Sequence, residues 1–410
     1  MRYYLLAALS VLFSCLPLFS YTVDKDLPAG NIAVDRIEGD NVFIHQELRD
    51  TEGDWFYWAF RVTGAEGRKL SFSFTKSVAV GSRGAAVSFD RGKTWRWSDD
   101  LDRTAPRDEL GDHRSWKSFD WTFGPDQHEA WFSQTIPYHP SDWESFLSRH
   151  AEDRGTVFET GVLCRTKKGR DIPYARFGRL GGKARERLFV TARHHCGEVT
   201  ANFVIEGMLE AFFAKDALGV WLRENVELRV VPFVDMDGVV DGDQGKNRRP
   251  WDPARDYNDD RPQQYPQVAA IMKMLRDWKP TGVQDTHCPW LRGNWKERWN
   301  TNEYCYQPGS RLNGTKMHAY GEIVERLSAK RMGYRAADDI PYGCGWNAPK
   351  NFTQGRTINT WANETFPDSK LVTTWEIPFA NQREKTLYPA DFRSFGRDVI
   401  DGWREYFATN

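Results

Sequence analysis

The sequence predicts a two-domain protein in which an antiparallel β-sandwich precedes an α/β domain with a mixed sheet flanked by helices. Three observations lead to this prediction. The chain has 410 residues, which is enough for two or three domains. Short alternating runs of apolar and polar residues fill residues 31–138, which is typical of a sandwich. After residue 150 the period changes, and apolar strands alternate with helical stretches.

The first 21 residues have the pattern of a secretory signal peptide. One Arg precedes a largely apolar run at residues 5–19, which is shorter than the about 20 residues that a membrane-spanning helix needs. We therefore expect an exported protein, periplasmic or secreted, without a membrane span. Lipid anchoring at Cys15 is the alternative, and the bulky Phe13 and the apolar residues beyond Cys15 count against it.

Residues 22–149 are predicted to form the β-sandwich domain. Alternating runs lie at residues 41–45, 55–60 and 69–74, with Gly and Asp turns between them. Residues 88–95 resemble the Asp-box hairpin of sialidases, in which an Asp side chain closes a tight turn. A single copy indicates a turn only, because a propeller would repeat the blade. A helix from Ser141 to residue 151 is expected to lead into the second domain.

Residues 150–410 are predicted to form the α/β domain. Strands are expected at residues 188–192, 226–234, 282–284 and 371–379. Helices are expected at residues 199–213, 267–278, 317–328 and 391–407. Because strand and helix alternate, we expect a parallel or mixed sheet with both faces covered.

Charge and cysteine content limit the possible partners and cross-links. The chain has 56 Lys and Arg against 57 Asp and Glu, so no bulk positive field favours a nucleic acid or an anionic membrane. Beyond Cys15 five cysteines remain, an odd number, so at least one thiol has no partner within the chain. Buried free thiols and one or two disulfides both stay open, as does the oligomeric state.

The sharpest local motif is His195-Cys-Gly-Glu198, which directly follows a predicted strand. Ligands gather at the carboxyl ends of parallel strands, and a His and a Glu three residues apart can direct a nitrogen and an oxygen at one point. Asp285-Thr-His287 ends another apolar stretch and offers His287 as a third ligand. Two His and one Glu leave one coordination position of zinc open, which is typical of a catalytic site. The sequence therefore predicts one Zn²⁺ per chain.

Two further features belong with this metal site. Glu376 is a lone carboxylate in an apolar strand, and its burial is costly unless the carboxylate is paired or acts in catalysis. A metal-bound water would be such a partner. The polar residues 235–259 follow another strand and could supply charged groups that hold a substrate, although a solvated loop would have the same composition.

The order of these motifs resembles the zinc metallocarboxypeptidases, and most closely the cytosolic carboxypeptidase or deglutamylase-like branch, which has a β-sandwich before the peptidase domain. The resemblance covers residues 30–410 and rests on His195-Cys-Gly-Glu198, Met236-Asp-Gly-Val239, Asp256-Tyr-Asn-Asp259, Asp285-Thr-His287 and Glu376. It implies a zinc-dependent peptidase with an α/β/α fold. The implied roles are the zinc ligands His195, Glu198 and His287, the general base Glu376, the carbonyl-polarising Arg249 with Arg248 as its neighbour, and Asp256 as the carboxylate that orients His195.

Two departures from the family pattern concern substrate recognition. The Asn-Arg pair that binds the terminal carboxylate reads Asn258-Asp259 here, so a cation has been replaced by an anion. The subsite tyrosine, expected about twenty residues before the general base, is absent because no Tyr occurs between Tyr342 and Glu376, and Trp361 is the nearest aromatic residue of similar reach. We therefore expect retained hydrolysis with altered recognition of the free carboxylate, in which Arg248, Arg255 or Arg261 could restore an anion site. The expected substrate-binding residues are Arg248, Asn258, Asp259 and Trp361.

These observations predict an exported zinc metallopeptidase of carboxypeptidase type. Its expected substrate is a peptide or a cell-wall stem peptide, and Asp259 could receive an amine of a basic or diamino residue. The alternative is a secreted glycan-binding protein with a degenerate peptidase fold, in which the many Trp of the sandwich bind sugar. Metal content separates the two, because a binding module needs no zinc.

Overall fold

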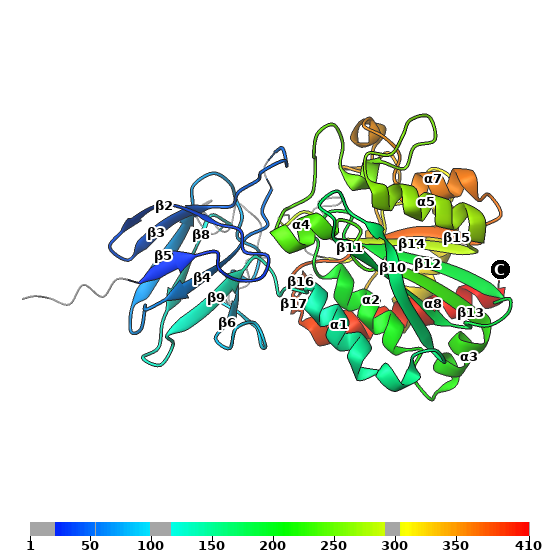
Figure 1. Cartoon of the computed structure of the whole chain (residues 1–410), viewed down its shortest axis with the longest axis horizontal. Helices are drawn as coiled ribbons and strands as arrows, with labels where there is room; N and C mark the ends of the chain where they lie inside the picture. Colours follow the sequence, from blue (N-terminus) through cyan, green and yellow to red (C-terminus); the bar gives the residue numbers. More distant parts are fainter. Residues whose placement is uncertain (1–20, 54, 99–115, 292–303, 410) are drawn as a thin grey trace, which may run out of the picture.

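The computed structural model describes residues 21–53, 55–98, 116–291 and 304–409. The expected signal peptide, apart from Tyr21, and the expected lipidation site Cys15 lie outside the described residues. The β-sandwich and the α/β domain lie side by side, and the predicted fold class is confirmed (Figure 1). In the described part of the chain no helix has the length and apolar character that crossing a membrane requires.

The N-terminal domain consists of two packed sheets. The first has the order β1(Thr22–Asp24), β4(Ala59–Thr63), β9(Glu129–Ser133), β6(Ala86–Ser88) and β7(Arg96–Trp97). The second has the order β2(Ala33–Glu38), β3(Asn41–His45), β5(Lys69–Phe74) and β8(Ser118–Thr122). Neighbouring strands are antiparallel except β3 and β5, which pair in parallel. The predicted Asp-box turn lies between β6 and β7, where the Asp90 carboxylate accepts a hydrogen bond from the Thr94 backbone N–H at 2.9 Å.

Aromatic side chains fill the space between these two sheets. The ring of Phe60 on β4 lies 5.1 Å from that of Phe72 on β5, and Phe72 lies 5.3 Å from Phe132 on β9. Alternation along each strand sends these residues to one face, so the apolar pattern of the sequence forms a single core.

Helix α1(Pro140–Arg149) connects the sandwich to the second domain, close to the predicted residues 141–151. It begins after His139, with Pro140 as the first helical residue, rather than at Ser141.

The second domain is built on a six-stranded mixed sheet. Its order is β10(Phe158–Arg165), β11(Asp171–Gly178), β13(Val226–Val231), β12(Glu186–Ala192), β14(Gly282–His287) and β15(Leu371–Glu376). The last four strands are parallel, while the β10–β11 and β11–β13 pairs are antiparallel. The predicted β strands thus form the parallel part of the sheet, and β14 extends through the Asp-Thr-His motif to His287.

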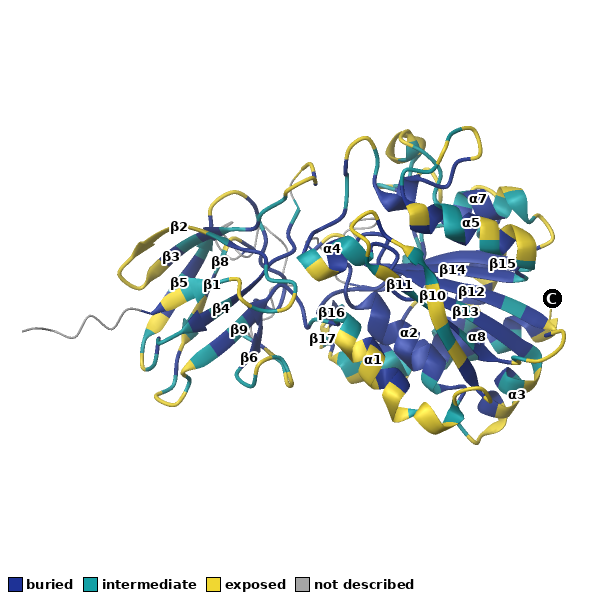
Figure 2. Cartoon of the chain, viewed as in Figure 1, coloured by how far each residue is buried: buried dark blue, intermediate teal, exposed yellow. Residues whose placement is uncertain are grey.

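Helices cover both faces of this sheet and leave β12, β13, β14 and β15 almost fully buried, whereas the edge strand β10 is largely exposed (Figure 2). The further elements are α2(Ala201–Glu210), α3(Ala217–Asn225), α4(Met236–Asp241), α5(Pro266–Trp278), α6(Gly314–Ser328), α7(Ile358–Thr365), β16(Asn381–Gln382), β17(Lys385–Thr386) and α8(Pro389–Thr409). Phe189 and Val283 pack with residues of α5 and α7 on one face, while Leu188 and Val190 pack with residues of α2 and α8 on the other. The period of two along β12 and β14 therefore builds two cores.

All five cysteines of the described residues are free thiols, so no disulfide joins them. They are Cys164, Cys196, Cys288, Cys305 and Cys344.

Candidate active site

The site lies where three parallel strands end side by side. Strand register places Ala192 of β12 opposite Thr286 of β14, and His287 at the end of β14 opposite Glu376 at the end of β15. Residues three to six positions beyond β12 form the turn that carries His195 and Glu198. The strand order of the sheet thus brings His195, His287 and Glu376 to one edge, although His287 and Glu376 follow His195 by 92 and 181 residues.

The turn after β12 is shaped by Arg193, which adopts the left-handed conformation with φ 61°. Its buried guanidinium donates to the carbonyl of Cys196 at 2.6 Å and to the side-chain oxygen of Asn202 at 3.0 Å. These hydrogen bonds offset the conformational free energy that a positive φ costs a non-glycine residue, and they hold the turn against helix α2. The role of Arg193 could not be predicted from the sequence, because nothing in the local pattern marks a positive φ.

The three expected metal ligands meet at this turn. His195 Nδ1 lies 2.7 Å from Glu198 Oε1, and His287 Nδ1 lies 2.6 Å from Glu198 Oε2. One ligand atom of each residue lies within 4.8 Å of the others, and all three side chains are buried. The glutamate therefore sits between two imidazole nitrogens that face one centre.

A carboxylate lies behind each of the two imidazoles. His287 Nε2 lies 2.8 Å from Asp285 Oδ2, and His195 Nε2 lies 3.6 Å from Asp252 Oδ1. The other oxygen of Asp252 accepts the Asn247 backbone N–H at 2.9 Å. Metal-binding histidines commonly donate the hydrogen of their second nitrogen to a carboxylate, which fixes the ring and leaves the first nitrogen for the ion. The donor set and its supports therefore fit a zinc ion, with two nitrogen donors and one carboxylate.

The charges of the neighbouring histidines shift the pKa values of Glu198 and Asp285. Burial raises the pKa of Glu198, but the charges and hydrogen bonds of His195 and His287 outweigh burial and hold it well below its usual range. Burial also raises the pKa of Asp285, and His194 and His287 reverse that effect. Both carboxylates are thus ionised at neutral pH, as metal ligation and ligand orientation require.

Glu376 has the opposite shift. Burial, together with the nearby negative charges of Glu198 and Asp285, raises its pKa to about 8 against the opposing positive charges of His287 and Lys246. Its backbone N–H donates to the carbonyl of Tyr306 at 2.9 Å, which fixes the end of β15. A carboxyl group with raised proton affinity beside two imidazoles is the environment expected of a general base.

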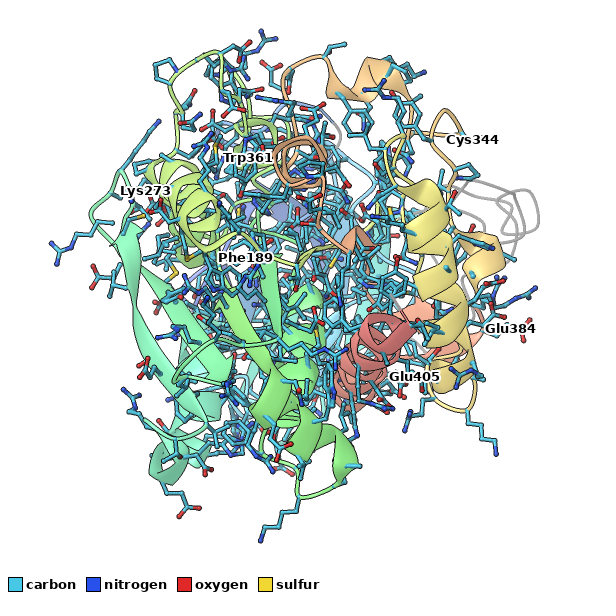
Figure 3. The ribbon with its side chains drawn as sticks, turned by 90° about the vertical axis from the view of Figure 1, so that its right-hand side faces the viewer. Phe189, Lys273, Cys344, Trp361, Glu384 and Glu405 are labelled. Carbon is cyan, nitrogen blue, oxygen red and sulfur yellow. The ribbon has the colours of Figure 1, made fainter. Side chains whose placement is uncertain are left out.

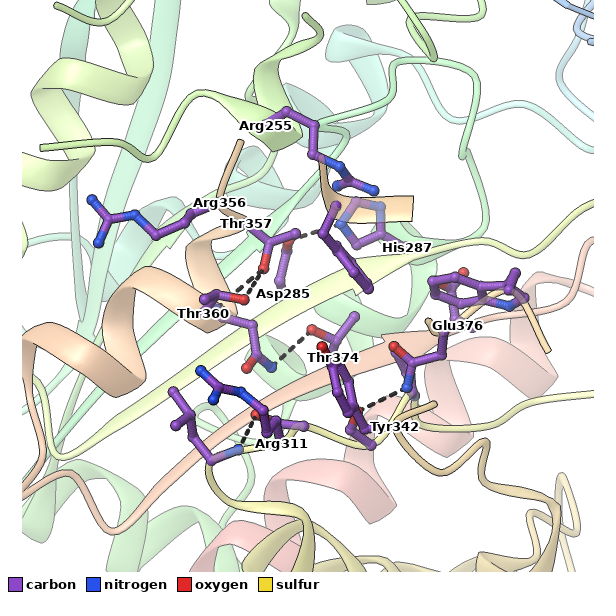
Figure 4. A pocket seen from close by; sticks show the side chains of 18 of the residues that line it. Arg255, Asp285, His287, Arg311, Tyr342, Arg356, Thr357, Thr360, Thr374 and Glu376 are labelled. Carbon is purple, nitrogen blue, oxygen red and sulfur yellow. Dashed lines mark hydrogen bonds and ion pairs between the residues drawn. The ribbon is translucent and has the colours of Figure 1, made fainter. Parts of the chain in front are cut away.

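A pocket opens beside these residues and is lined by four cations (Figure 4). They are Lys246, Arg255, Arg311 and Arg356. Arg255 is 6% exposed, and among the described residues no carboxylate pairs with it. Lys246 Nζ lies 3.3 Å from His195 Nε2. Because an unpaired buried cation is costly, the Arg255 guanidinium is suited to binding an anionic group of a ligand.

Uncharged polar groups line another part of the pocket. Asn359 donates to the Thr374 hydroxyl at 3.1 Å, and Thr357 and Thr360 lie beside them (Figure 4). Tyr342 and Trp346 provide aromatic lining. Tyr342 lies 34 residues before Glu376, outside the interval in which the sequence analysis sought a subsite tyrosine.

Two arginines expected at the site lie elsewhere. The Arg249 side chain is 78% exposed and pairs with Glu52 of the sandwich, so it does not reach the pocket. Arg248 is buried and forms ion pairs with Asp235 at 2.6 Å and Asp50 at 2.8 Å. The expectation that Arg249 polarises a carbonyl and that Arg248 binds substrate is therefore corrected, because each guanidinium already has carboxylate partners away from the pocket.

Asp256 and Asn258 also have local partners. The Asp256 carboxylate accepts hydrogen bonds from Trp251 Nε1 at 2.6 Å and from the Tyr265 backbone N–H at 2.8 Å, whereas Asp252 lies behind His195. Asn258 donates to the carbonyl of Arg255 at 2.9 Å and accepts the backbone N–H of Arg356 at 3.1 Å. Asn258 therefore supports two pocket arginines and does not line the pocket itself.

Asp259 and Trp361 interact with each other rather than with the pocket. Trp361 Nε1 donates to Asp259 Oδ2 at 3.2 Å, and Asp259 also pairs with Arg356 at 3.0 Å and with Arg276. Trp361 is fully buried among packed side chains, in contrast to the outward-pointing Lys273 (Figure 3). Both expectations of substrate binding are corrected, since Asp259 is neutralised by two arginines and Trp361 belongs to the core.

The corrected positions form a motif of their own. Asp252-Pro-Ala-Arg255 places a carboxylate behind His195 and a cation in the pocket, four residues before the segment that the sequence analysis chose. An Asp followed three residues later by an Arg is the signal that could have identified this motif. Asp252 and Arg255 have this spacing, whereas the sequence analysis assigned it to Asp256 and Asp259. Of the three arginines named in the sequence analysis as able to restore an anion site, Arg255 lines the pocket, and the altered recognition of the terminal carboxylate stays a prediction.

A second possible metal group consists of His194, Asp285 and His287. His194 Nδ1 lies 2.9 Å from Asp285 Oδ1, and its Nε2 lies 2.7 Å from the Tyr257 hydroxyl. Both nitrogens of His194 thus have hydrogen-bond partners. We interpret this group as the network that orients Asp285 behind His287.

Residues 143–318 match the zinc carboxypeptidase family, peptidase M14. An uncharacterized protein of Zymomonas mobilis, ZMO1242, is 24% identical over 65% of this chain and 67% of its own length. Cytosolic carboxypeptidase 2 of Xenopus tropicalis is 23% identical over 72% of this chain. The match covers 31% of that relative and 24% of mouse cytosolic carboxypeptidase 3, so the chain spans less than two thirds of these proteins.

Solved structures share the fold over both domains. A metallo-carboxypeptidase from Burkholderia cenocepacia has a TM-score of 0.75 and 17% identity, covering 95% of this chain and 100% of the other. A metallo-carboxypeptidase from Pseudomonas aeruginosa, solved with (2-guanidinoethylmercapto)succinic acid, has a TM-score of 0.74 and 18% identity, covering 94% and 99%. Residues 143–318 are thus similar to the zinc carboxypeptidase family, and the solved metallo-carboxypeptidases share the fold of nearly the whole chain.

Proposed function

We propose that the chain is a zinc-dependent metallocarboxypeptidase that removes the C-terminal residue of a peptide. One observation carries this proposal: Glu198 lies between the Nδ1 atoms of His195 and His287, and Glu376 and a cationic pocket lie beside them. The donors could hold an ion, the carboxylate could move a proton, and the cations could bind a terminal carboxylate.

His195, Glu198 and His287 would hold the zinc ion. When bound, zinc activates a water molecule for attack and polarises the carbonyl that is attacked. Asp252 and Asp285 keep the two imidazole rings oriented through their Nε2 atoms.

Glu376 performs the proton transfers. Its carboxylate accepts a proton from the attacking water and then delivers that proton to the amine that leaves, so the C–N bond breaks with a neutral amine product. The raised pKa of Glu376 gives it the proton affinity that both steps need. The carboxyl group ends the reaction in the ionisation state in which it began.

Lys246 and Arg255 take different roles in the pocket. Lys246, beside His195, stabilises negative charge on the oxygen of the attacked carbonyl, which replaces the role first assigned to Arg249. Arg255 binds the terminal carboxylate of the substrate through its planar guanidinium.

The charge of the pocket favours substrates with acidic or uncharged polar C-terminal residues. Arg311 and Arg356 add positive charge, and Asn359 and Thr374 can hydrogen-bond a polar side chain. A basic terminal residue would face like charges. This proposal replaces the idea that Asp259 receives an amine. If the chain is exported, as its first 21 residues predict, its substrates are peptides outside the cytoplasm, including cell-wall stem peptides.

The glycan-binding alternative depended on the aromatic residues of the sandwich. All sandwich Trp residues among those described are buried or half-buried, and the Phe cluster forms the core between the sheets. Among the described residues of the sandwich, no Phe, Tyr or Trp side chain is exposed to more than an intermediate degree.

A peptide panel assayed with apo and zinc-loaded protein tests the proposed function. Peptides ending in Glu, Gln and Lys are compared with the same peptides amidated at the C-terminus. We expect zinc-dependent release of the last residue, faster for Glu and Gln than for Lys, and loss of activity on amidated peptides. Equal cleavage of amidated and free peptides would contradict carboxypeptidase action, and activity of the apo protein would contradict the zinc mechanism.

A further inference from the structure

We infer that the β-sandwich domain positions part of the active site through a loop of the peptidase domain. We call residues 242–252 the active-site loop, because they carry Lys246 and Asp252. We call residues 49–53 and 55–57 the sandwich segment. The inference rests on the proposed function, since it assigns the two active-site groups a support from the other domain.

The active-site loop contains no helix or strand, so its shape depends on contacts with its surroundings. Within the peptidase domain it meets the metal-binding turn, where the carbonyl of Gln244 accepts the Gly197 backbone N–H at 3.2 Å and the carbonyl of Asp243 accepts the Cys196 thiol at 3.0 Å. Gly245 has φ 77°, and a side chain there would lie 2.7 Å from the backbone nitrogen of Cys196. The loop therefore packs tightly against the residues that follow His195.

The other side of the loop is held by backbone groups of the sandwich segment. The side-chain oxygen of Gln244 accepts two hydrogen bonds, from the backbone N–H of Phe56 at 3.1 Å and of Tyr57 at 2.9 Å. Gln244 is buried, so these N–H groups satisfy an oxygen that water does not reach. Gln244 thus links the sandwich directly to the turn that carries His195 and Glu198.

Charged pairs extend this contact along the loop. Arg49 pairs with Asp243 and donates to the carbonyl of Asp241 at 2.6 Å. Asp50 pairs with Arg248 at 2.8 Å, and Arg248 is itself buried. Buried ions that lose one partner are strongly destabilised, so the sandwich charges restrict where the loop can lie.

A short strand-like contact also joins the sandwich segment to the active-site loop next to Lys246. Thr51 and Arg248 form an isolated antiparallel bridge, and the Glu52 backbone N–H donates to the carbonyl of Asn247 at 3.3 Å. The backbone N–H of Asn247 in turn donates to Asp252, the carboxylate behind His195. The chain of contacts therefore runs from the sandwich segment through the active-site loop to His195. Arg49 and Asp50 are positioning residues in this arrangement.

The double variant Arg49→Gln/Asp50→Asn tests the inference from the sandwich side. We expect kcat to fall about tenfold or more while KM changes little, because a small displacement of Lys246 weakens transition-state contacts more than substrate binding. Limited trypsin digestion gives a readout that does not depend on activity. Cleavage after Lys246 and Arg248 should become several-fold faster when the loop is released.

Arg83→Ala is the matched control, because Arg83 joins the domains away from the loop. Its guanidinium donates to Asn381 at 2.7 Å and to the carbonyl of Glu384 at 3.1 Å. We expect this variant to lower thermal stability without changing kcat or loop cleavage. The inference is overturned if the double variant leaves both kcat and loop cleavage unchanged, or if Arg83→Ala reproduces both effects. If the wild-type protein cleaves no peptide, the proposed function fails, and the digestion comparison still decides whether the sandwich holds the loop.

Discussion

At the scale of single residues, the site separates groups that must be charged from a group that must exchange a proton. Glu198 lies between two imidazoles that keep its pKa low, whereas burial raises the pKa of Glu376 to about 8. Both carboxyls are buried and interact with His287, yet their surroundings shift their pKa values in opposite directions. This difference assigns Glu198 to ligand binding and Glu376 to proton transfer.

The variant Glu376→Gln should therefore bind zinc normally and lose most of its turnover. Glutamine has the same size but cannot accept the proton of the attacking water, so we expect kcat to fall by about 10²-fold or more. Metal analysis and peptide hydrolysis on the same preparation measure both properties. Full activity in this variant would remove Glu376 from the mechanism.

The pair Asp252→Asn and Asp256→Asn distinguishes the carboxylate that supports the metal ligand from its neighbour in sequence. Asp252 lies behind His195, whereas Asp256 binds Trp251 and Tyr265. We expect Asp252→Asn to weaken zinc affinity about 10- to 100-fold and Asp256→Asn to leave it near wild type. Competition with a chelator measures the affinity, and the reverse order of effects would restore the sequence-based assignment.

At the scale of elements, the ends of β12, β14 and β15 determine which side chains meet. The sequence predicted these strands because their apolar runs are bounded by polar turns, and it predicted His195, Glu198, His287 and Glu376 as candidates because each follows or ends such a run. It did not predict Lys246 or Asp252 at the site, and it named Arg255 only as one of three arginines that could restore an anion site. Lys246 and Asp252 lie in an irregular loop, and Arg255 ends the short 3-10 helix Pro253–Arg255 that follows the loop. The course of this segment depends on distant contacts, which leave no local periodicity in the sequence.

A buried carboxyl group, that of Asp339, is linked to strand β15 through Gln307. The Asp339 carboxylate accepts the Gln307 backbone N–H at 2.7 Å, and Gln307 accepts a hydrogen bond from Thr373 of β15. Burial raises the pKa of Asp339 to about 8, although the hydrogen bonds from Gln307 and Tyr334 oppose this. The folded state therefore keeps a proton that the unfolded chain, with an ordinary Asp pKa, has already released.

Stability should consequently fall as pH rises between about 4 and about 8, and the penalty should be complete above this range. Asp339→Asn removes the titration, so the wild type should lose stability relative to this variant by up to about 1.4 kcal/mol per pH unit within the window. Urea denaturation of both proteins at pH 5, 6.5 and 8 measures the difference. Parallel pH profiles would show that Asp339 does not titrate in this way.

At the scale of the whole molecule, the two domains form a continuous structure around the site. Apolar residues of the sandwich and of the peptidase domain belong to one core cluster, and Phe56 of the sandwich contacts Phe379 beyond β15 with ring centroids 5.7 Å apart. The sequence predicted the order and the class of the domains from their different periods. It could not predict that the sandwich contacts the active-site loop, because those contacts join residues about 190 positions apart.

The central claim is that His195, Glu198 and His287 form one zinc site in the folded chain. Zinc content of the purified, zinc-equilibrated protein tests it most directly when compared with the variant His195→Ala. We predict one zinc per chain in the wild type and a large loss of bound zinc in the variant, with a lower unfolding temperature. A wild type without zinc, or a variant with the same stoichiometry, would contradict the claim.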